Sequence, residues 1–294
     1  MSTANKVYRG RFAPSPTGPL HMGSLIAALA SFLDARHQQG EWLLRIEDLD
    51  PPRVIHGATD LILTSLDRHG LHWDGEVMWQ GQRNEAYEHA LSQLRELGLL
   101  FHCDCTRSRL GPDGSCSGRC LPRQHEVVQP TALRIAVPEG TSLEFDDIWQ
   151  GQQRVALGRD TPDFILKRKD SLYAYQLAVV VDDAEQGISH IIRGSDILDS
   201  SARQLYLQQT LAYPAPTYGH IPLISDSMGQ KLSKRSYATP LDDELACTNL
   251  RYALAFLQQA PPAAELECPE ELLKHAVLGW SRDAVPTEMS IQQH

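Results

Sequence analysis

The pattern of hydrophobic and polar positions changes period twice within the first fifty residues. Residues 7–12, VYRGRF, read as a short strand, and a Pro- and Gly-rich turn follows at 14–23. Residues 24–40 then carry apolar side chains at helical spacing and stop at Gly40. A second strand, EWLLRIEDLD at 41–50, ends in carboxylates. This β–loop–α–β order predicts an α/β fold with a doubly wound parallel sheet that binds a nucleotide.

The remaining chain mixes both periods. Helical spacing continues near 55–69 and 83–98, whereas residues 101–130 break the pattern with many Cys, Gly, Pro and Arg residues. The segments beyond are interpreted as strand-like at 131–137, 154–157 and 163–183, as a strand and turn at 188–198, as helical at 201–213, as a strand at 220–225, and as helices at 241–259 and 269–279. We expect the tail from residue 281 to be weakly structured.

Composition narrows the class of protein. With 294 residues and 42% hydrophobic content, the chain is long enough for a substantial core and has the composition of a globular protein. No stretch approaches the ~18–20 apolar residues of a membrane span, and no secretory signal is visible, so we expect a cytoplasmic protein without a membrane partner. The net charge of −10 argues against a wide nucleic-acid surface and restricts any such contact to a local basic patch.

The turn RFAPSPTGPLHMGS, residues 11–24, has the chemistry of a phosphate site. Ligands of open α/β sheets bind near such strand-to-helix turns, and the start of a helix attracts anions. Gly18 and Gly23 would let a ligand approach the backbone, and Thr17 and His21 can donate hydrogen bonds to phosphate oxygens. Taken alone, the motif slightly favours an ordinary turn that carries an exposed histidine, because short motifs recur by chance.

Four of the six cysteines fall in one short stretch, as Cys103-x-Cys105 and Cys116-x₃-Cys120. Two close pairs of thiolates suit one tetrahedral Zn²⁺, and four ligands with no open position indicate a structural site. Arg107, Arg109 and Arg119 would offset its negative charge, His102 is a possible substitute ligand, and free cysteines in a loop are the alternative. Cys247 and Cys268 lie far along the chain, and we expect them to be buried.

Five segments in order resemble one family. RFAPSPTGPLHMGS resembles the HIGH signature of class I aminoacyl-tRNA synthetases, and 231-KLSKR-235 resembles their KMSKS signature, with Arg235 in place of the final serine. The segments 45-RIEDLDPPR-53, 173-YAYQLAVVVDD-183 and 193-RGSDIL-198 resemble the glutamyl and glutaminyl subgroup. The resemblance covers roughly residues 7–240 and implies the Rossmann-type catalytic domain of that family.

The resemblance implies a reaction of ATP, accompanied by Mg²⁺, with L-glutamate to give glutamyl-adenylate and pyrophosphate. Arg11, on the first loop, and Arg193, at a strand end, would favour the acid glutamate over its amide. The implied catalytic residues are His21, Gly23, Lys231 and Lys234. Those implied for glutamate are Arg11, Phe12, Ala13, Pro14, Ser15, Glu47, Tyr175 and Arg193, and those for ATP are Thr17, His21, Gly23, Ser233 and Lys234.

Full-length members of the subgroup continue into an anticodon-binding domain, whereas only 59 residues follow Arg235 here. We therefore expect no anticodon-binding domain. The expected division is 1–100 for the first half of the catalytic domain, 101–130 for the zinc insertion, 131–240 for an acceptor-type insertion and the second half, and 241–294 for a short helical segment and tail.

A truncated branch of the family attaches glutamate, activated without tRNA, to the queuosine base at the wobble position of tRNA(Asp). The resemblance implies this reaction, with queuosine-bearing tRNA(Asp) as the partner of a monomeric enzyme. The alternatives are a shortened synthetase that charges the tRNA 3′ end, and a non-catalytic paralogue that binds a nucleotide or a partner.

Overall fold

The computed structural model describes residues 7–225 and 239–292 and contains the predicted parallel sheet. Strands β1 (Arg9–Phe12), β2 (Glu41–Ile46) and β3 (Met78–Trp79) pair in parallel in the order β3-β2-β1. Strand β9 (His190–Gly194) follows beside β1, where the Ser189 amide donates to the Arg9 carbonyl over 2.9 Å, and β10 (Thr217–Ile221) pairs in parallel with β9. The chain therefore crosses from the first half of the sheet to the second beside β1, as doubly wound folds do.

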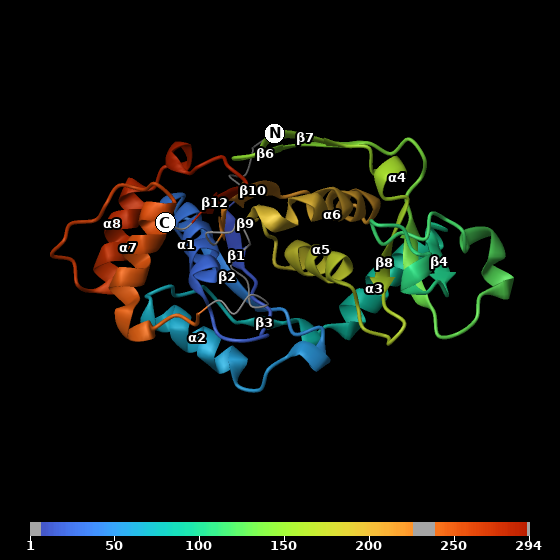
Figure 1. Ribbon diagram of the computed structural model, residues 1–294, viewed down its shortest axis with the longest axis horizontal. Coiled ribbons are helices and arrows are strands. Elements are labelled where there is room, and N and C mark those ends of the chain that lie inside the picture. Colours follow the sequence, from blue (N-terminus) through green and yellow to red (C-terminus); the bar gives the residue numbers. More distant parts are fainter. Residues whose placement is uncertain (1–6, 226–238, 293–294) are drawn as a thin grey trace.

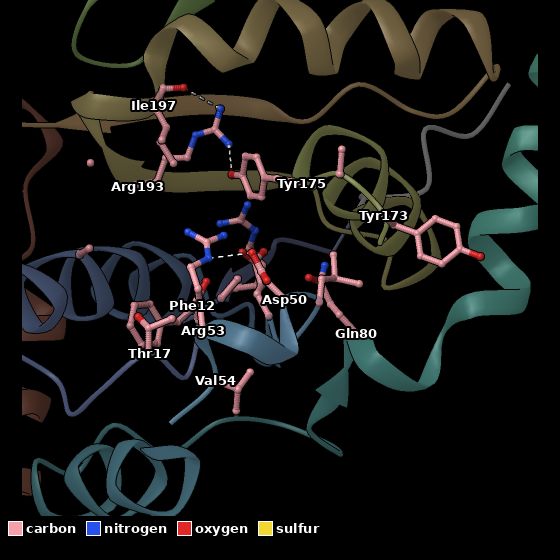
Figure 2. A pocket seen from close by; sticks show the side chains of 18 of the residues that line it. Phe12, Thr17, Asp50, Arg53, Val54, Gln80, Tyr173, Tyr175, Arg193 and Ile197 are labelled. Carbon is pink, nitrogen blue, oxygen red and sulfur yellow. Dashed lines mark hydrogen bonds and ion pairs between the residues drawn. The ribbon is translucent and has the colours of Figure 1, made fainter. Parts of the chain in front are cut away.

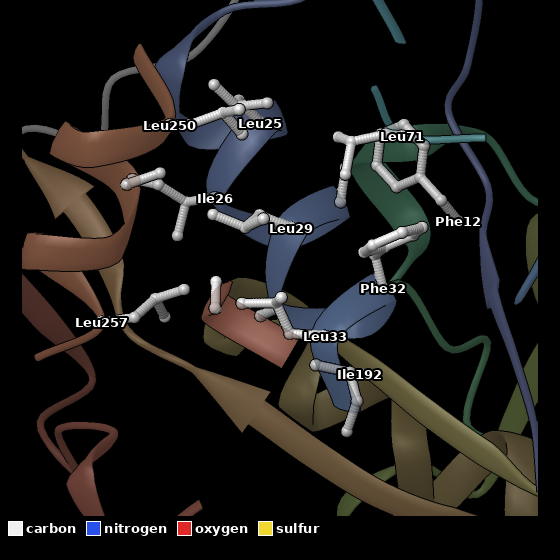
Figure 3. Close-up of a cluster of buried hydrophobic side chains, with 14 of the residues drawn as sticks. Phe12, Leu25, Ile26, Leu29, Phe32, Leu33, Leu71, Ile192, Leu250 and Leu257 are labelled. Carbon is white, nitrogen blue, oxygen red and sulfur yellow. The ribbon is translucent and has the colours of Figure 1, made fainter. Parts of the chain in front are cut away.

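Helix α1 (Met22–His37) is buried between the sheet and the carboxyl-terminal helices. It packs against β1, β2 and β9 on one side and against α7 (Ala246–Phe256) and α8 (Pro269–Gly279) on the other. Leu25, Leu29 and Leu33 line up at helical spacing within this core (Figure 3). Burying one such side chain stabilises the fold by about 1.5–3 kcal/mol, which explains why the helix is apolar on nearly every face. Helix α2 (Ala58–Arg68) adds Ile62 and Leu66 to the same cluster.

A second core forms around α3 (Asn84–Glu96), α5 (Tyr175–Glu185) and α6 (Leu198–Thr210). The strand-like prediction for 163–183 is correct only for β8 (Asp163–Lys167), because residues 175–185 form helix α5. The β-branched run at 179–181 favours a strand locally, but both sides of the segment are buried here. Packing of α5 against α3 and α6 outweighs that local preference. Because residues 177–183 are buried throughout, the sequence shows no polar stripe there that would have indicated a helix.

The middle of the chain forms an extension at one end of the molecule. Strands β4 (Leu100–Cys103), β5 (Ala132–Ala136) and β8 make an antiparallel sheet, and β6 (Leu143–Asp147) and β7 (Gly151–Val155) make a hairpin that reaches back to β10. A short helix, α4 (Leu157–Asp160), follows the hairpin. Figure 1 shows β4 at the opposite end of the molecule from α7 and α8.

Two predictions for the end of the chain are wrong. The tail was expected to be weakly structured, yet β12 (Ser290–Gln292) pairs in parallel with β11 (Leu223–Ser225). Cys268 is exposed and Cys247 only half-buried. Cys268 stands at the start of α8, where its thiol donates to Glu270 over 2.7 Å, so it belongs to a solvated helix end and not to the core. In the described ranges, no helix combines the length and apolar character needed to cross a membrane.

Candidate active site

A cavity of about 610 Å³ opens at the carboxyl ends of β1, β2 and β9 (Figure 2). This is the edge where open α/β sheets bind their ligands. Seven residues predicted from the sequence to bind substrate, together with Thr17, contribute to its wall: Arg11, Phe12, Ala13, Ser15, Glu47, Tyr175 and Arg193. The structure thus brings together side chains that lie up to 182 positions apart, from Arg11 to Arg193.

A smaller cavity of about 360 Å³ adjoins the first, and Phe12, Ala13, Ser15 and Thr17 line both. His21, Gly23 and Pro14 line only this second cavity, with Ser24 and several apolar side chains. Two adjoining chambers, one with several charged side chains in its wall and one beside a helix start, suit two substrates that must react with each other. The predicted residues Lys231, Ser233 and Lys234 lie outside the described residues.

His21 is the capping residue of α1. Its Nδ1 accepts the backbone N–H of Ser24 over 3.3 Å. In a neutral imidazole the hydrogen is then on Nε2, which makes that nitrogen a donor beside the helix start. A Cβ atom at Gly23 would come within 3.2 Å of the His21 ring and 3.4 Å of Ile224. The glycine therefore lets the ring fold over the first turn of the helix.

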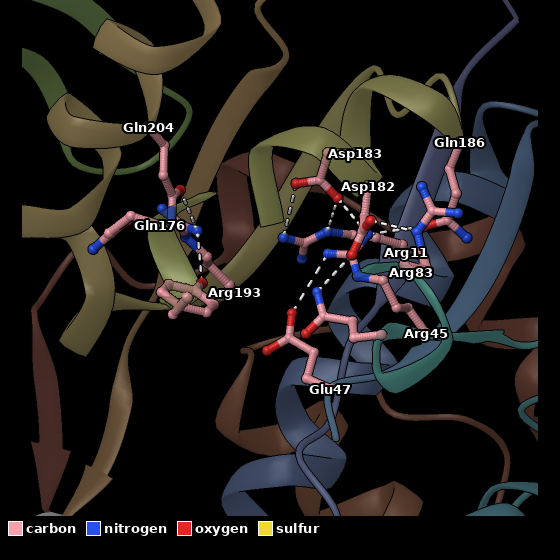
Figure 4. A network of polar contacts seen from close by, with 12 residues as sticks. Arg11, Arg45, Glu47, Arg83, Gln176, Asp182, Asp183, Gln186, Arg193 and Gln204 are labelled. Atoms are coloured by element: carbon pink, nitrogen blue, oxygen red, sulfur yellow. Dashed lines mark hydrogen bonds and ion pairs between the residues drawn. The ribbon is translucent and has the colours of Figure 1, made fainter. Parts of the chain in front are cut away.

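Arg11 lies inside β1, not on the loop as expected, and its charge is matched by an aspartate of α5. Its Nε and Nη2 donate to the two carboxylate oxygens of Asp183 over 3.2 and 3.4 Å, and Arg45 Nη1 donates to the same carboxylate over 2.7 Å. Burial alone would raise the pKa of Asp183, but the two guanidinium groups outweigh it and hold that pKa below its usual value. Figure 4 shows this ionic group, with Asp182 beside it.

Glu47 is the carboxylate of this group that faces the cavity. Its side chain is 11% exposed, and its Oε1 lies 3.5 Å from Arg45 Nη2. Burial raises the pKa of Glu47 despite the pull of Arg45 and Arg11. A cationic ligand at this position would lower that pKa again, so Glu47 suits an ammonium group.

Arg193 is as deeply buried as Arg11 but has different surroundings. Among the described residues its hydrogen-bond partners are all neutral: His220, Gln204, Ser201, Tyr175 and the Ile197 carbonyl. Figure 4 shows it with Gln176 and Gln204, apart from the ionic group. A buried cation without an anionic partner is costly, so this arrangement favours an anionic ligand in the cavity.

Sequence reasoning missed the partners that hold these groups. Asp183 and Arg45 lie within the family-like segments, but no role was predicted for them from the sequence. Two aspartates directly after an apolar run are an unusual pattern, and buried aspartates need cationic partners. His220 and Asp147 are 73 positions apart in the chain and form a buried pair that carries no local signal.

The cysteine stretch forms a small buried cluster of its own. The sulfurs of Cys103, Cys105 and Cys120 all lie within 4.8 Å of one another, and Cys120 is 3.6 Å from Cys105 and 3.7 Å from Cys103. Tetrahedral zinc with Zn–S bonds of about 2.3 Å would place its sulfurs about 3.8 Å apart, so these three residues fit a metal ion. Cys116 is buried in the same cluster but is not among the three sulfurs within that distance, and His102 is exposed and bonded to Thr131.

Asp163 connects this cluster to β8. Its carboxylate accepts the backbone N–H groups of Cys116 and Gly118, each over 3.0 Å, and pairs with Arg134. Arg119, expected to balance thiolate charge, donates instead to the backbone carbonyls of Cys116 and Arg109. The loop is thus held by its own cysteines and by one buried carboxylate.

Comparisons with known proteins agree with this architecture. Residues 7–114 and 117–253 match the model of tRNA synthetases class I (E and Q), catalytic domain. A glutamyl-Q tRNA(Asp) synthetase of Pseudomonas entomophila is 48% identical over 97% of both chains, and one of Acinetobacter baylyi is 45% identical, again over 97% of both.

Solved structures give the same result at the level of the fold. The glutamate-tRNA synthetase of Elizabethkingia anophelis superposes with a TM-score of 0.82 at 24% identity, over 98% of this chain and 68% of that one. A glutamate tRNA ligase of Elizabethkingia meningosepticum, solved with its amino acid, gives 0.80 at 25% identity, over 97% and 66%. The chain belongs to the glutamate and glutamine (E and Q) group of class I tRNA synthetases, whose catalytic domain it contains.

Proposed function

We propose that this protein activates L-glutamate with ATP and transfers it to the queuosine base of tRNA(Asp). The observation that carries the first half is Arg193, a buried cation at the cavity wall whose described partners are all neutral. The second half rests on relatives at 45–48% identity that bear the name glutamyl-Q tRNA(Asp) synthetase and align over almost their full length.

In the activation step, an oxygen of the glutamate α-carboxylate attacks the α-phosphorus of ATP. The bond from that phosphorus to the bridging oxygen breaks, and pyrophosphate leaves. Two anions must meet, so the protein supplies position and fixed positive charge instead of a nucleophile. Arg193 would hold the side-chain carboxylate and Glu47 the ammonium group, which leaves the α-carboxylate to face the second cavity.

In the second cavity, His21 and the start of α1 would bind the phosphates. A donor at Nε2 and the positive end of the helix dipole both stabilise the charge that develops on the leaving pyrophosphate. Lys231 and Lys234 are proposed to add to this charge and Ser233 to bind ATP, as the resemblance implies, with Mg²⁺ bound to the nucleotide.

In the transfer step, a hydroxyl of queuosine's cyclopentenediol ring attacks the carbonyl carbon of the adenylate, and AMP leaves. Arg53 and Arg168 line the cavity with partly exposed side chains, and both bind Asp50, over 2.7 and 2.9 Å. These cations agree with a small, local contact to tRNA, which the acidic net charge also favours.

A transfer assay tests the proposal. The protein is incubated with ATP and labelled glutamate, with and without tRNA, and the labelled position of the tRNA is mapped after periodate or alkali treatment. We expect adenylate without tRNA and label on the queuosine base. Label on the terminal ribose would assign the protein to charging of the 3′ end, and absence of adenylate under both conditions would favour a non-catalytic paralogue.

We also propose that Cys103, Cys105, Cys116 and Cys120 hold one structural Zn²⁺ in the insertion. The sulfur separations of 3.6 and 3.7 Å support Cys103, Cys105 and Cys120 as ligands, and Cys116 is buried in the same cluster. Zinc released from the denatured protein should equal about one ion per chain, and Cys105→Ser should abolish it. Cys268→Ser is the matched control, because that thiol is exposed and far along the chain. No zinc in the wild-type protein would refute the site.

A further inference from the structure

Three buried side chains form a hydrogen-bonded triad behind the cavity. Asp147 ends β6, His220 lies in β10, and Arg193 lies in β9, on neighbouring strands of one sheet. Asp147 Oδ2 is 2.5 Å from His220 Nδ1, and Arg193 Nε donates to His220 Nε2 over 2.9 Å. Their exposures are 4%, 0% and 5%. This triad therefore connects the β6–β7 hairpin to the cavity wall.

The donors and acceptors in this triad determine the tautomer of His220. An arginine N–H can only donate, so His220 Nε2 must accept and the imidazole is neutral, with its hydrogen on Nδ1. That hydrogen points at Asp147 Oδ2, while Asp147 Oδ1 accepts the backbone N–H groups of Trp149, Gln150 and His220. Both carboxylate oxygens of Asp147 accept hydrogen bonds, and only one tautomer of His220 can make both of the bonds in the triad.

The contacts of Arg193 divide by length and by position. The three contacts to His220, Gln204 and Ser201 measure 2.9, 2.9 and 2.8 Å, and these residues do not line the cavity. The two longer contacts, 3.3 Å to Tyr175 and 3.5 Å to the Ile197 carbonyl, go to residues that do (Figure 2). One longer contact comes from each Nη atom, so both Nη groups have a weakly bonded donor near the cavity. A carboxylate that binds both would meet the planar fork of a guanidinium.

We propose that Asp147 and His220 are positioning residues that fix the rotation of the Arg193 guanidinium, so that both Nη groups face the carboxylate of the substrate. This inference rests on the proposed function, in which that carboxylate belongs to glutamate. The pair acts on substrate only through Arg193.

Asp147→Asn tests the inference most directly. The three backbone N–H groups retain the amide oxygen at the Oδ1 position, so the amide NH₂ faces His220 Nδ1 and drives the hydrogen to Nε2. Two donors then oppose each other at Arg193. We expect the KM for glutamate in ATP–pyrophosphate exchange to rise at least about tenfold, with the KM for ATP within about twofold of wild type.

Two further variants separate positioning from simple structural support. His220→Gln offers Arg193 Nε an amide oxygen and should keep a lower KM for glutamate than His220→Leu, which offers none. Asp146→Asn makes the same chemical change one position earlier on the same strand, where the side chain is exposed, and should leave every constant unchanged. ¹⁵N-histidine NMR, assigned with His220→Gln, should show the hydrogen of His220 on Nδ1 in wild type and on Nε2 in Asp147→Asn.

Three results would overturn the inference. A KM for glutamate within about twofold of wild type in Asp147→Asn would show that Asp147 does not position Arg193. An equal rise in the KM values for glutamate and ATP would show that Asp147 and His220 only support the fold. A wild-type His220 with its hydrogen on Nε2 would contradict the geometry directly, whether or not the variants fold. If wild type shows no glutamate-dependent exchange, the proposed function and the inference fail together, whereas an active wild type with an unaffected variant overturns the inference alone.

Discussion

Arg11 and Arg193 lie on neighbouring strands, are 4% and 5% exposed, and line the same cavity. The Arg11 side is ionic, because Asp183 binds both Arg11 and Arg45. The Arg193 side is neutral in its direct contacts, since the described partners are amides, hydroxyls, a carbonyl and an imidazole, and the Asp147 carboxylate reaches Arg193 only through His220. Equal burial therefore does not mean equal function. On the ionic side a carboxylate binds the guanidinium directly, whereas the Nη groups of Arg193 contact no carboxylate among the described residues, which favours an anionic ligand there.

The largest expected effect is on stability, at the ionic side. Asp183→Ala leaves two buried arginines without their shared carboxylate and should lower the free energy of unfolding by about 3–5 kcal/mol. Urea unfolding measures it. Asp160→Ala is the control, because its pair with Arg159 is exposed and should contribute nothing measurable. A loss for Asp183→Ala as small as that of the control would show that the ionic side is not structural.

The second effect separates the two arginines by activity. Arg193→Gln should lower kcat/KM for glutamate by about 100- to 1,000-fold, because a desolvated carboxylate loses its charged fork. Arg11→Gln should act mainly on stability, since the Asp183 carboxylate already engages that guanidinium. ATP–pyrophosphate exchange and urea unfolding of both variants measure the two effects. Equal losses of activity with equal stability would abolish the distinction.

A smaller effect tests whether Tyr175 contributes to substrate binding on the neutral side. Tyr175→Phe removes the hydroxyl that accepts one of the two longer Arg193 contacts and should raise the KM for glutamate by about three- to tenfold. Tyr173→Phe is the matched control, because Tyr173 lines the same cavity but donates to Glu88 over 2.7 Å. Indistinguishable KM values for the two variants would remove Tyr175 from the substrate site.

The smallest effect is a difference in acid sensitivity between the sides. Burial lowers the pKa of His220 and of His190, so both take up protons on unfolding, and stability should begin to fall as the pH drops below the ordinary histidine value of 6.5. Asp183 on the ionic side and Asp147 on the neutral side both have a lowered pKa, and both keep their contributions until the pH falls below the ordinary carboxyl value of 3.8. Unfolding free energies measured across this range should show two stages.

His220→Gln checks which stage belongs to the neutral side. The first stage should shrink in this variant, and His190 should account for what remains. In the second stage the contribution of Asp183 should stay, whereas that of Asp147 should shrink, because His220 helps to lower the pKa of Asp147. A first stage of full size in the variant would mean that His220 does not titrate as its surroundings require.

The sequence alone predicts the elements that form this site but not the side-chain contacts that hold its residues in place. The β–loop–α–β opening, the turn with His21 and the helices at 241–259 and 269–279 follow from local periodicity and turn chemistry, and the structure confirms them. Helix α5 was predicted as a strand because Val179, Val180 and Val181 favour one locally. The Asp147–His220 pair was not predictable, since pairing across neighbouring strands depends on the assembled sheet.

The short strand β12 has a consequence for the smaller cavity. It pairs with β11, and Met289 just before it accepts hydrogen bonds from the Leu223 amide and the Ser195 hydroxyl. Leu223 and Ile224 line the smaller cavity, so the carboxyl-terminal strand braces the wall of the proposed nucleotide site. A substitution that weakens the pairing of β12 with β11 would therefore loosen one wall of that site, although β12 itself contributes no side chain to it.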